Sequence, residues 1–221
     1  MIKNKIFLYD LRVVLFPIIK RTIDIISSLI LLLIFSPILI ATVIIIKITS
    51  PGPIFFKQQR VGKNGLFSMY KFRSMRTGDN DQFLLENYPE LWIKYKNNDW
   101  KLSANEDPRI TKIGRFIRAT SVDEMPQFIN VLRGEMSLVG PRAYRDEELM
   151  EYAQKYPATQ KYISDIRSIK PGITGPWQVS GRNGLSFEKR AKLDSDYANN
   201  RSILNEIINI LKTPLAMFSN W

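Results

Sequence analysis

An uncharged, mostly aliphatic run from Ile25 to Ile46 constrains this chain more than any other feature. In a helix with a rise of about 1.5 Å per residue, these residues would reach roughly 33 Å, close to the hydrocarbon thickness of a bilayer. Ser36 and Pro37 interrupt the run at its middle, and a proline removes one backbone hydrogen bond and kinks or breaks a helix. The run therefore predicts a membrane helix with a break at Ser36-Pro37.

Basic residues on both sides of the run bear on its path through the membrane. Lys20 and Arg21 precede it, Lys47 follows it, and residues 51–76 include several basic residues and no acidic one. Loops rich in Lys and Arg stay on the cytoplasmic side, so both ends of the run and of the chain are expected there. A re-entrant hairpin satisfies both flanks. A kinked spanning helix, in which proline is tolerated, places only one basic flank on the cytoplasmic side. The residues by themselves leave both paths open.

The 221-residue chain contains neither histidine nor cysteine, and its formal net charge is +11. This composition excludes histidine-based triads, imidazole or thiolate metal sites, and disulfides. Any reaction must use carboxylates, Lys, Arg, Ser, Thr or Tyr. The positive charge fits nucleic acid, anionic lipid or a phosphate-rich substrate, and the membrane run favours the last two.

Turn and periodicity signals predict an α+β fold that is mostly helical. Two β-like stretches, 54–61 and 66–75, flank Gly62–Gly65 and predict a small β-hairpin. Residues 109–118 and 202–218 show the spacing of amphipathic helices, which suits packing on a core or lying at a membrane interface.

The adjacent carboxylates Asp123 and Glu124 are the leading candidates for chemistry. Pro126 lacks an N–H and fits the first turn of a helix, so a helix is predicted to begin near Val122 or Asp123. Both carboxylates would then project from its positive end, which lowers a carboxylate pKa and attracts phosphate. The same residues also fit an ordinary helix cap, with Ser121 and Glu124 spelling a capping box.

A carboxylate can act as a nucleophile toward phosphorus, and such chemistry needs a divalent cation and basic groups around the phosphate oxygens. The basic candidates are Lys71, Arg73, Arg109 and Arg142. Each alone also fits a surface charge. Three further basic residues recur every third position and suit lipid headgroups, namely Lys112, Arg115 and Arg118. Arg142 lies in a rigid Gly-Pro turn and is expected to matter more than this basic stripe.

Several motifs, in this order, resemble the bacterial sugar transferase family, the monotopic polyprenyl-phosphate phosphoglycosyl transferases. They are Lys20–Asp24, Thr49–Pro53, Tyr70–Met75, Asp107–Thr111, Val122–Gln127, Ser137–Arg142 and Lys170–Gly175. The resemblance extends over nearly the whole chain. It implies a re-entrant membrane helix broken at Ser36-Pro37, with amphipathic helices at the interface. The chain resembles the minimal form of the family, without a large N-terminal membrane domain.

The resemblance also implies an activity. A sugar-1-phosphate would pass from a nucleoside diphosphate sugar, expected to be a UDP-sugar, to polyprenyl (undecaprenyl) phosphate, with Mg²⁺ as cofactor. Asp123 would be the nucleophile, the carrier of a covalent phosphosugar intermediate and a metal ligand. Glu124 would be its dyad partner, and Lys71 and Arg142 would be phosphate-side groups. These roles belong to the first membrane step of exopolysaccharide, O-antigen or glycoconjugate assembly.

The segment Trp177–Arg182 resembles family members that act on hexose-1-phosphates in exopolysaccharide or O-antigen assembly. It puts Gln178 and Arg182 on the nucleotide or sugar side. Two positions depart from the family pattern without touching the dyad. Ala143 stands where a second proline is frequent, and Pro176 stands where an aliphatic residue is usual.

The implied location is the bacterial inner (cytoplasmic) membrane, in monotopic form, with the active site on the cytoplasmic face. The chain then divides into a lead-in with the re-entrant helix, 1–48, and a cytoplasmic catalytic domain with a C-terminal interfacial helix, 49–221. The implied partners are the nucleoside diphosphate sugar, polyprenyl phosphate and the phospholipid bilayer, with downstream glycosyltransferases as candidates and no nucleic acid. The alternative is a membrane-anchored basic protein that binds anionic lipid or nucleic acid without catalysis.

Overall fold

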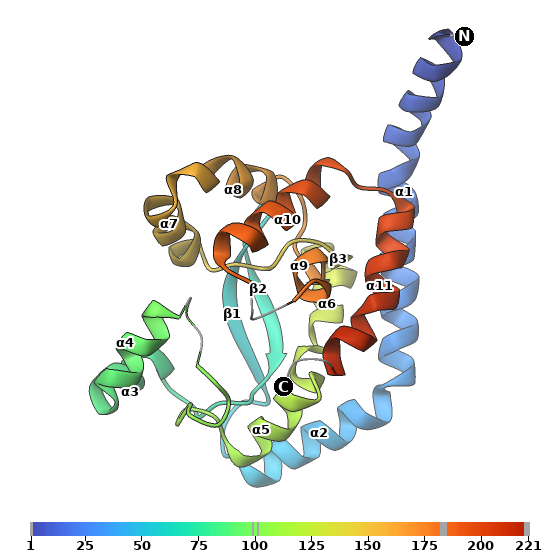
Figure 1. Ribbon diagram of the computed structural model, residues 1–221. Coiled ribbons are helices and arrows are strands. Elements are labelled where there is room, and N and C mark those ends of the chain that lie inside the picture. Colours follow the sequence, from blue (N-terminus) through green and yellow to red (C-terminus); the bar gives the residue numbers. More distant parts are fainter. Residues whose placement is uncertain (1, 99, 101, 182–184, 219–221) are drawn as a thin grey trace.

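The computed structural model describes residues 2–98, 100, 102–181 and 185–218 (Figure 1). Within these ranges the chain is mostly helical, with one two-stranded antiparallel sheet and one two-stranded parallel sheet. The predicted fold class, α+β and mostly helical with a small hairpin, is confirmed for the described residues.

Helices α1 (Ile2–Ile34) and α2 (Ser36–Thr49) form one bent pair along the edge of the molecule (Figure 1). The axes of the two helices differ by 62° at the break. Pro37 lies in the first turn of α2, where its missing N–H costs nothing. The Ser36 hydroxyl donates to the carbonyl of Leu33 at 2.8 Å, which satisfies one group of the interrupted helix. The predicted break at Ser36-Pro37 is therefore present, and the predicted lead-in is continuous with the apolar helix.

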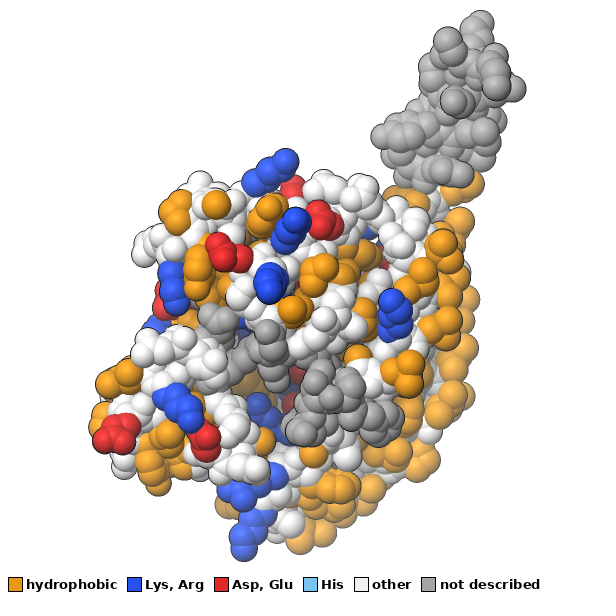
Figure 2. Space-filling view, viewed as in Figure 1, with side chains coloured by type: hydrophobic (Ala, Val, Ile, Leu, Met, Phe, Trp, Pro, Cys, Tyr) orange, Lys and Arg blue, Asp and Glu red, His pale blue; other side chains and the backbone are white. Residues whose placement is uncertain are grey.

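The outer faces of this pair are apolar and uncovered. Leu33 is 76% exposed and Ile48 is 78% exposed, and hydrophobic side chains line the edge of the molecule along α1 (Figure 2). In the described part of the chain, no single helix is long and apolar enough to cross a bilayer, and only the bent pair taken together passes that test. A continuous apolar surface of this kind indicates contact with a membrane or a partner.

The predicted hairpin is formed by β1 (Phe55–Gly62) and β2 (Gly65–Phe72), which are antiparallel. Gly65 has φ of +107°, a conformation that favours glycine, and it closes the two-residue turn. Phe67 and Met69 are buried on the face of β2 that meets α6, and Lys71 follows on the same face.

A short parallel pair is formed by β3 (Ser137–Val139) and β4 (Gly172–Thr174), two segments for which the sequence predicted no strand. The backbones approach so closely that a Cβ on Gly172 would lie 2.1 Å from the Gly140 nitrogen. Glycine is therefore required there. The pairing of segments more than thirty residues apart brings the Gly140-Pro141-Arg142 turn beside the segment that follows β4.

The remaining elements pack around these two sheets. They are α3 (Asn80–Asn87), α4 (Pro89–Asn97), α5 (Lys112–Ala119), a 3₁₀ turn (Val122–Glu124), α6 (Gln127–Arg133), α7 (Asp146–Lys155), a second 3₁₀ turn (Pro157–Thr159), α8 (Gln160–Arg167), α9 (Pro176–Val179), α10 (Phe187–Asn199) and α11 (Ile203–Phe218). One apolar core lies between α7, α8 and α10, and another lies between the hairpin and α6. Helices α5 and α11 correspond to the two predicted amphipathic helices.

Buried polar contacts fasten α1 to the rest of the molecule. The Arg21 guanidinium donates to the carbonyls of Val131, at 2.6 Å, and Leu132, at 2.9 Å, in the last turn of α6. A cation at that position satisfies free carbonyls and opposes the negative end of the helix dipole. The Asp24 carboxylate accepts the N–H of Leu138 at 3.0 Å. The helix that carries the apolar run is therefore bound to α6 and β3.

Candidate active site

Asp123 and Glu124 lie in the 3₁₀ turn between α5 and α6, not within an α-helix. The predicted helix start near residue 122 is present as this 3₁₀ turn, whereas the α-helix α6 begins only at Gln127, with Pro126 at its N-cap. The predicted capping box is absent. Ser121 has φ of +55° and makes no side-chain cap, whereas a capping serine needs an extended backbone.

The two carboxylates differ in their surroundings. Asp123 is only 7% exposed, whereas the Glu124 side chain is 41% exposed. Lys71 reaches across from β2 and places its Nζ 2.6 Å from Glu124 Oε1. The exposed member of the pair is thus paired with a lysine, and the buried member has no ion-pair partner among the described residues.

These surroundings separate the pKa values of the two carboxyls. Burial raises the pKa of Asp123 to about 6, with the negative charge of Glu124 adding to it and the charge of Lys71 opposing it. Burial also acts on Glu124, but Lys71, followed by Arg142 and Arg118, outweighs it and lowers the pKa of Glu124 below its ordinary value. The expectation that the position lowers a carboxylate pKa is therefore wrong for Asp123, because loss of solvent outweighs the nearby positive charge.

Asn130, which the sequence analysis did not single out, holds α6 against β2. It is fully buried. Its Oδ1 accepts the N–H of Tyr70 at 3.0 Å, and its Nδ2 donates to the carbonyl of Ser68 at 2.8 Å. These two bonds to the backbone of β2 take the place of pairing with a further strand, one residue before Lys71. The only sequence signal for this role of Asn130 was its polar side chain among the apolar residues of a short helix.

Two arginines act on the pair from different elements. Arg142 follows β3, and Arg118 lies on α5, and the charge of each lowers the pKa of Glu124. Arg118 acts on Asp123 as well. Arg118 is half-buried, whereas Lys112 and Arg115 are exposed. The three residues of the basic stripe therefore do not behave alike, and Arg118 belongs with the dyad.

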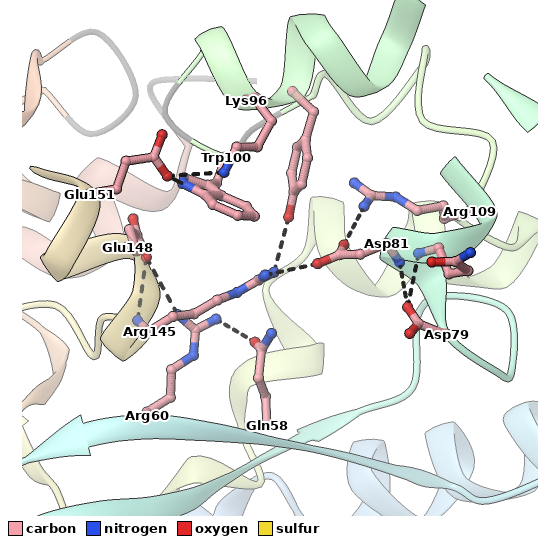
Figure 3. Close-up of polar contacts among 12 residues, drawn as sticks. Gln58, Arg60, Asp79, Asp81, Lys96, Trp100, Arg109, Arg145, Glu148 and Glu151 are labelled. Atoms are coloured by element: carbon pink, nitrogen blue, oxygen red, sulfur yellow. Dashed lines mark hydrogen bonds and ion pairs between the residues drawn. The ribbon is translucent and has the colours of Figure 1, made fainter. Parts of the chain in front are cut away.

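Arg73 and Arg109 are bound to other protein groups. Arg73 donates to the carbonyls of Ser50 and Pro51, at the end of α2. Arg109 is buried and makes two bonds of 2.8 Å to Asp107. Figure 3 shows that Arg109 and Arg145 both meet Asp81, at 3.1 and 3.0 Å. No described hydrogen bond or ion pair joins the guanidinium of Arg73 or Arg109 to the dyad, because both are engaged with other protein groups.

Gln178 lies in α9, next to the Gly140-Pro141-Arg142 turn. Its Oε1 is buried and has no hydrogen-bond partner within the described residues, and a Cβ on Gly175 would lie 3.0 Å from it. The predicted role of Arg182 falls outside the residues that the structure describes. An acceptor without a partner at this position is consistent with a ligand or a water molecule there.

The fit of Mg²⁺ depends on the available oxygen ligands. Among the described residues there is no group of three or more acidic side chains that could cage a metal. Mg²⁺ commonly binds through one or two carboxylates together with substrate phosphates. Asp123 has no ion-pair partner among the described side chains and is next to Glu124, so the donor set fits a metal that arrives with a diphosphate.

Comparison with known proteins supplies an independent line of information. A family described as bacterial sugar transferase matches residues 15–220. The undecaprenyl-phosphate galactose phosphotransferase of Salmonella typhimurium is 43% identical over 88% of this chain, which covers 39% of that relative. The UDP-glucose:undecaprenyl-phosphate glucose-1-phosphate transferase of Escherichia coli is 35% identical over 91% of this chain, which covers 40% of that relative.

A shorter relative matches along most of its length. The exopolysaccharide production protein ExoY of Sinorhizobium fredii is 35% identical over 88% of this chain and 83% of its own. The chain therefore spans about two fifths of the length of the two longer curated relatives and most of the length of the shorter one. The family match over residues 15–220 includes the dyad, the hairpin, α2 and the part of α1 from residue 15 onward.

Proposed function

Because the chain belongs to the bacterial sugar transferase family, we propose that it transfers a sugar-1-phosphate from a nucleoside diphosphate sugar to a polyprenyl phosphate. A UDP-sugar is the expected donor and undecaprenyl phosphate the expected acceptor, since the names of similar proteins contain these compounds. The product would be a lipid-linked diphosphate sugar. Names of relatives such as ExoY support a place in exopolysaccharide or related glycan assembly.

The observation that carries this proposal is the buried Asp123 beside the Glu124–Lys71 ion pair. We assign Asp123 as the nucleophile. Its carboxylate oxygen attacks the phosphorus that bears the sugar, and the bond from that phosphorus to the bridging oxygen breaks. The nucleoside monophosphate leaves with the electron pair. A phosphate oxygen of the polyprenyl phosphate then attacks the same phosphorus and displaces Asp123.

The surrounding charges suit both steps. With a pKa of about 6, Asp123 is mostly ionised at neutral pH and is more basic than an ordinary aspartate. Lys71, Arg118 and Arg142 supply fixed positive charge near the transferred phosphoryl group, which is the main requirement of phosphoryl transfer. Glu124, half-buried and ion-paired with Lys71, keeps that lysine in place.

We propose Mg²⁺ as the cofactor, held by Asp123 together with the diphosphate oxygens of the donor. When bound, the metal would offset negative charge that develops on the diphosphate. The requirement is tested by measuring turnover with EDTA and then with Mg²⁺ restored.

We further propose that α1 and α2 form a re-entrant element in the bacterial inner membrane, with the site on the cytoplasmic face. The basic flanks and the 62° bend support this path. The polyprenyl phosphate would reach the site from the bilayer, and the soluble donor would reach it from the cytoplasm. Enzymes that extend the lipid-linked sugar, namely glycosyltransferases, would act next.

The test uses the purified full-length protein in detergent with a panel of nucleoside diphosphate sugars, undecaprenyl phosphate and Mg²⁺. Release of a nucleoside monophosphate and formation of the lipid-linked sugar are expected with at least one donor. Asp123→Asn should abolish both this turnover and the trapping of labelled phosphosugar on the protein. The exposed Asp196 on α10 provides a control, since Asp196→Asn should leave both unchanged.

Two results would oppose the proposal. Turnover by Asp123→Asn, after mass spectrometry has excluded hydrolysis of the new amide to Asp, would replace the covalent route by direct attack of the polyprenyl phosphate. No transfer with any donor, together with a graded loss of binding to anionic vesicles as Lys and Arg residues are removed, would favour the non-catalytic lipid-binding protein.

A further inference from the structure

The short loop that carries Arg142 is held at every backbone position from Gly140 to Tyr144. The Gly140 N–H donates to the carbonyl of Thr174 at 2.9 Å, and the Pro141 carbonyl accepts the N–H of Gly172 at 2.8 Å. Both contacts continue the parallel pairing of β3 and β4. They fix the first half of the loop.

The second half is fixed from two other elements. Asp194 on α10 accepts the Arg142 N–H through Oδ2 at 3.1 Å. Arg60 on β1 donates from Nη1 to the Ala143 carbonyl at 3.0 Å, and the N–H of the next residue in β1 donates to the Tyr144 carbonyl at 2.9 Å. The loop is therefore clamped between β1 and α10, two elements far apart in the sequence.

Unlike its backbone, the Arg142 side chain has a hydrogen-bond donor available to bind a ligand. Its Nε has no hydrogen-bond partner among the described residues, and its charge reaches Glu124. The guanidinium carbon lies 5.4 Å from the Trp177 ring, which limits its motion on one side. A guanidinium held in one place can bind a planar array of phosphate oxygens by two parallel hydrogen bonds.

Burying the two residues of the clamp, Asp194 and Arg60, costs free energy of folding. Asp194 is fully buried, and its Oδ1 has no partner in the described part of the chain. Arg60 is also buried, beside Gln58 and Glu148 (Figure 3). Burial of the Asp194 carboxyl group outweighs both its one hydrogen bond and the nearby charges of Arg142 and Arg190, so the group does not recover the free energy lost on leaving water. The stability of the fold therefore does not by itself account for the burial of Asp194 and Arg60.

We infer that Asp194 and Arg60 are positioning residues for Arg142, which they hold at the phosphate of the donor through the backbone of its loop. The inference rests on the proposed function, in which Arg142 contacts that phosphate. Neither residue touches the reacting atoms in this scheme. A displacement of about 1 Å in a positioned group can lower a rate by a factor of the order of a hundred.

The test is a double-mutant cycle on the full-length protein, with a nucleoside diphosphate sugar that the wild type turns over. Asp194→Ala alone is expected to slow turnover by about tenfold or more. In an Arg142→Ala background, the same change is expected to alter turnover by less than about twofold, because residues that act as a unit are strongly non-additive. Asp194→Asn keeps an acceptor for the Arg142 N–H and should stay within about threefold of the wild type.

Ser195 provides the matched control, since it is the next residue on α10, is buried, and donates to Asp165 on α8. Ser195→Ala should lower the melting temperature and leave turnover near the wild-type value. If Asp194→Ala is insoluble, Arg60→Met replaces it in the same cycle. A full loss that persists in the Arg142→Ala background, or an equal loss in Ser195→Ala, would overturn the inference. Failure of the proposed function would instead be visible in the wild type, as absence of transfer.

Discussion

The chemistry of this site depends on the different burial and ion pairing of two adjacent carboxyl groups. Asp123 is buried without an ion-pair partner among the described residues, and Glu124 is half-buried and bonded to Lys71. Burial disfavours the charged form of the first, and the lysine favours the charged form of the second. Two titratable groups whose pKa values are driven apart in this way can take different roles in one reaction.

Arg118 should matter far more than Arg115, its neighbour in the basic stripe. Arg118 acts on both carboxyls, whereas Arg115 is exposed. Removing a positioned charge from a phosphoryl-transfer site costs several kcal/mol of barrier, on the order of a hundredfold in rate. Arg118→Ala and Arg142→Ala should each show such a loss at any salt concentration. Arg115→Ala should cost at most a few-fold, and added salt should mask that loss.

The measurement is the initial rate at two salt concentrations with Mg²⁺ saturating. Equal losses for Arg118→Ala and Arg115→Ala, with equal salt sensitivity, would return Arg118 to the membrane-facing stripe. A small loss for Arg142→Ala would remove that residue from the site.

Asp194 should make stability depend on pH. Burial raises its pKa to about 8 in the folded protein, well above the ordinary value of an unfolded chain, about 3.9. Between these values the folded state holds a proton that the unfolded state has released. The contribution of this group is therefore complete below pH of about 4, and it is lost as the pH rises toward 8, at no more than about 1.4 kcal/mol per pH unit.

The melting temperature of the wild type should consequently fall relative to that of Asp194→Asn as the pH is raised from 5 to 8. Thermal unfolding in detergent at several pH values measures the difference, and Asp196→Asn on the same helix is the control. A constant difference between wild type and Asp194→Asn across this range would show that Asp194 does not gain a proton in the fold.

At the scale of elements, the bend between α1 and α2 is the feature on which the proposed re-entrant path depends. Pro37 cannot donate to the helix before it, and the Ser36 hydroxyl bonds the Leu33 carbonyl. These two side chains stabilise the broken form at the point where a spanning helix would continue. The resulting 62° bend leaves neither helix able to span alone among the described residues.

Replacing Ser36 with Leu and Pro37 with Ala should therefore straighten the pair and favour a spanning path. The chain has no cysteine, so Lys3→Cys and Asn64→Cys can report on either side of the pair without background. In intact cells, both sites should be protected from an impermeant thiol reagent in the otherwise wild-type protein. One of them should become labelled in the Ser36→Leu, Pro37→Ala variant.

Labelling of one site and not the other without these substitutions would mean that the pair spans the membrane as a kinked helix. Protection of both sites in the substituted protein would mean that the break does not control topology. Labelling after lysis serves as the control for reactivity of each cysteine.

At the scale of the whole molecule, the apolar helix α1 and the proposed site residues belong to one bonded framework. Arg21 joins α1 to the end of α6, Asp24 joins it to β3, and Lys20 bonds Glu206 on α11 at 2.5 Å. The dyad precedes α6 directly, and Arg142 follows β3 directly. The position of the dyad and of Arg142 relative to α1 is therefore fixed by side chains of α1.

Arg21→Met should loosen the C-terminal turn of α6. Carbonyls left without a donor in a partly buried place cost about 1 to 3 kcal/mol. Hydrogen exchange of amides in residues 127–133 should become faster, and turnover should fall. Lys47→Met also removes one basic charge beside the apolar run, but Lys47 is exposed and should leave exchange in α6 unchanged. Equal effects of both substitutions would indicate that only the membrane-facing charge matters.

The sequence by itself determined the features whose causes lie within a few residues. A proline in an apolar run fixes the place of the bend, and the glycines of the turn fix the hairpin from 55 to 72. The adjacent residues Asp123 and Glu124, together with the absence of histidine and cysteine, make carboxylates the leading candidates for the chemistry. These conclusions need only local backbone geometry and the reactivity of side chains.

Tertiary structure decided what depends on distant parts of the chain. The pairing of β3 with β4 brings Gly140 and Gly172 together, and no local pattern encodes that contact. The pKa of Asp123 follows from burial, which the helix-dipole argument could not supply. The roles of the arginines also depend on tertiary structure. Arg73 and Arg109 bind other protein groups, whereas the charge of Arg118 acts on the dyad. Charge and spacing specify which groups are available, and only packing determines which of them lose water and face each other.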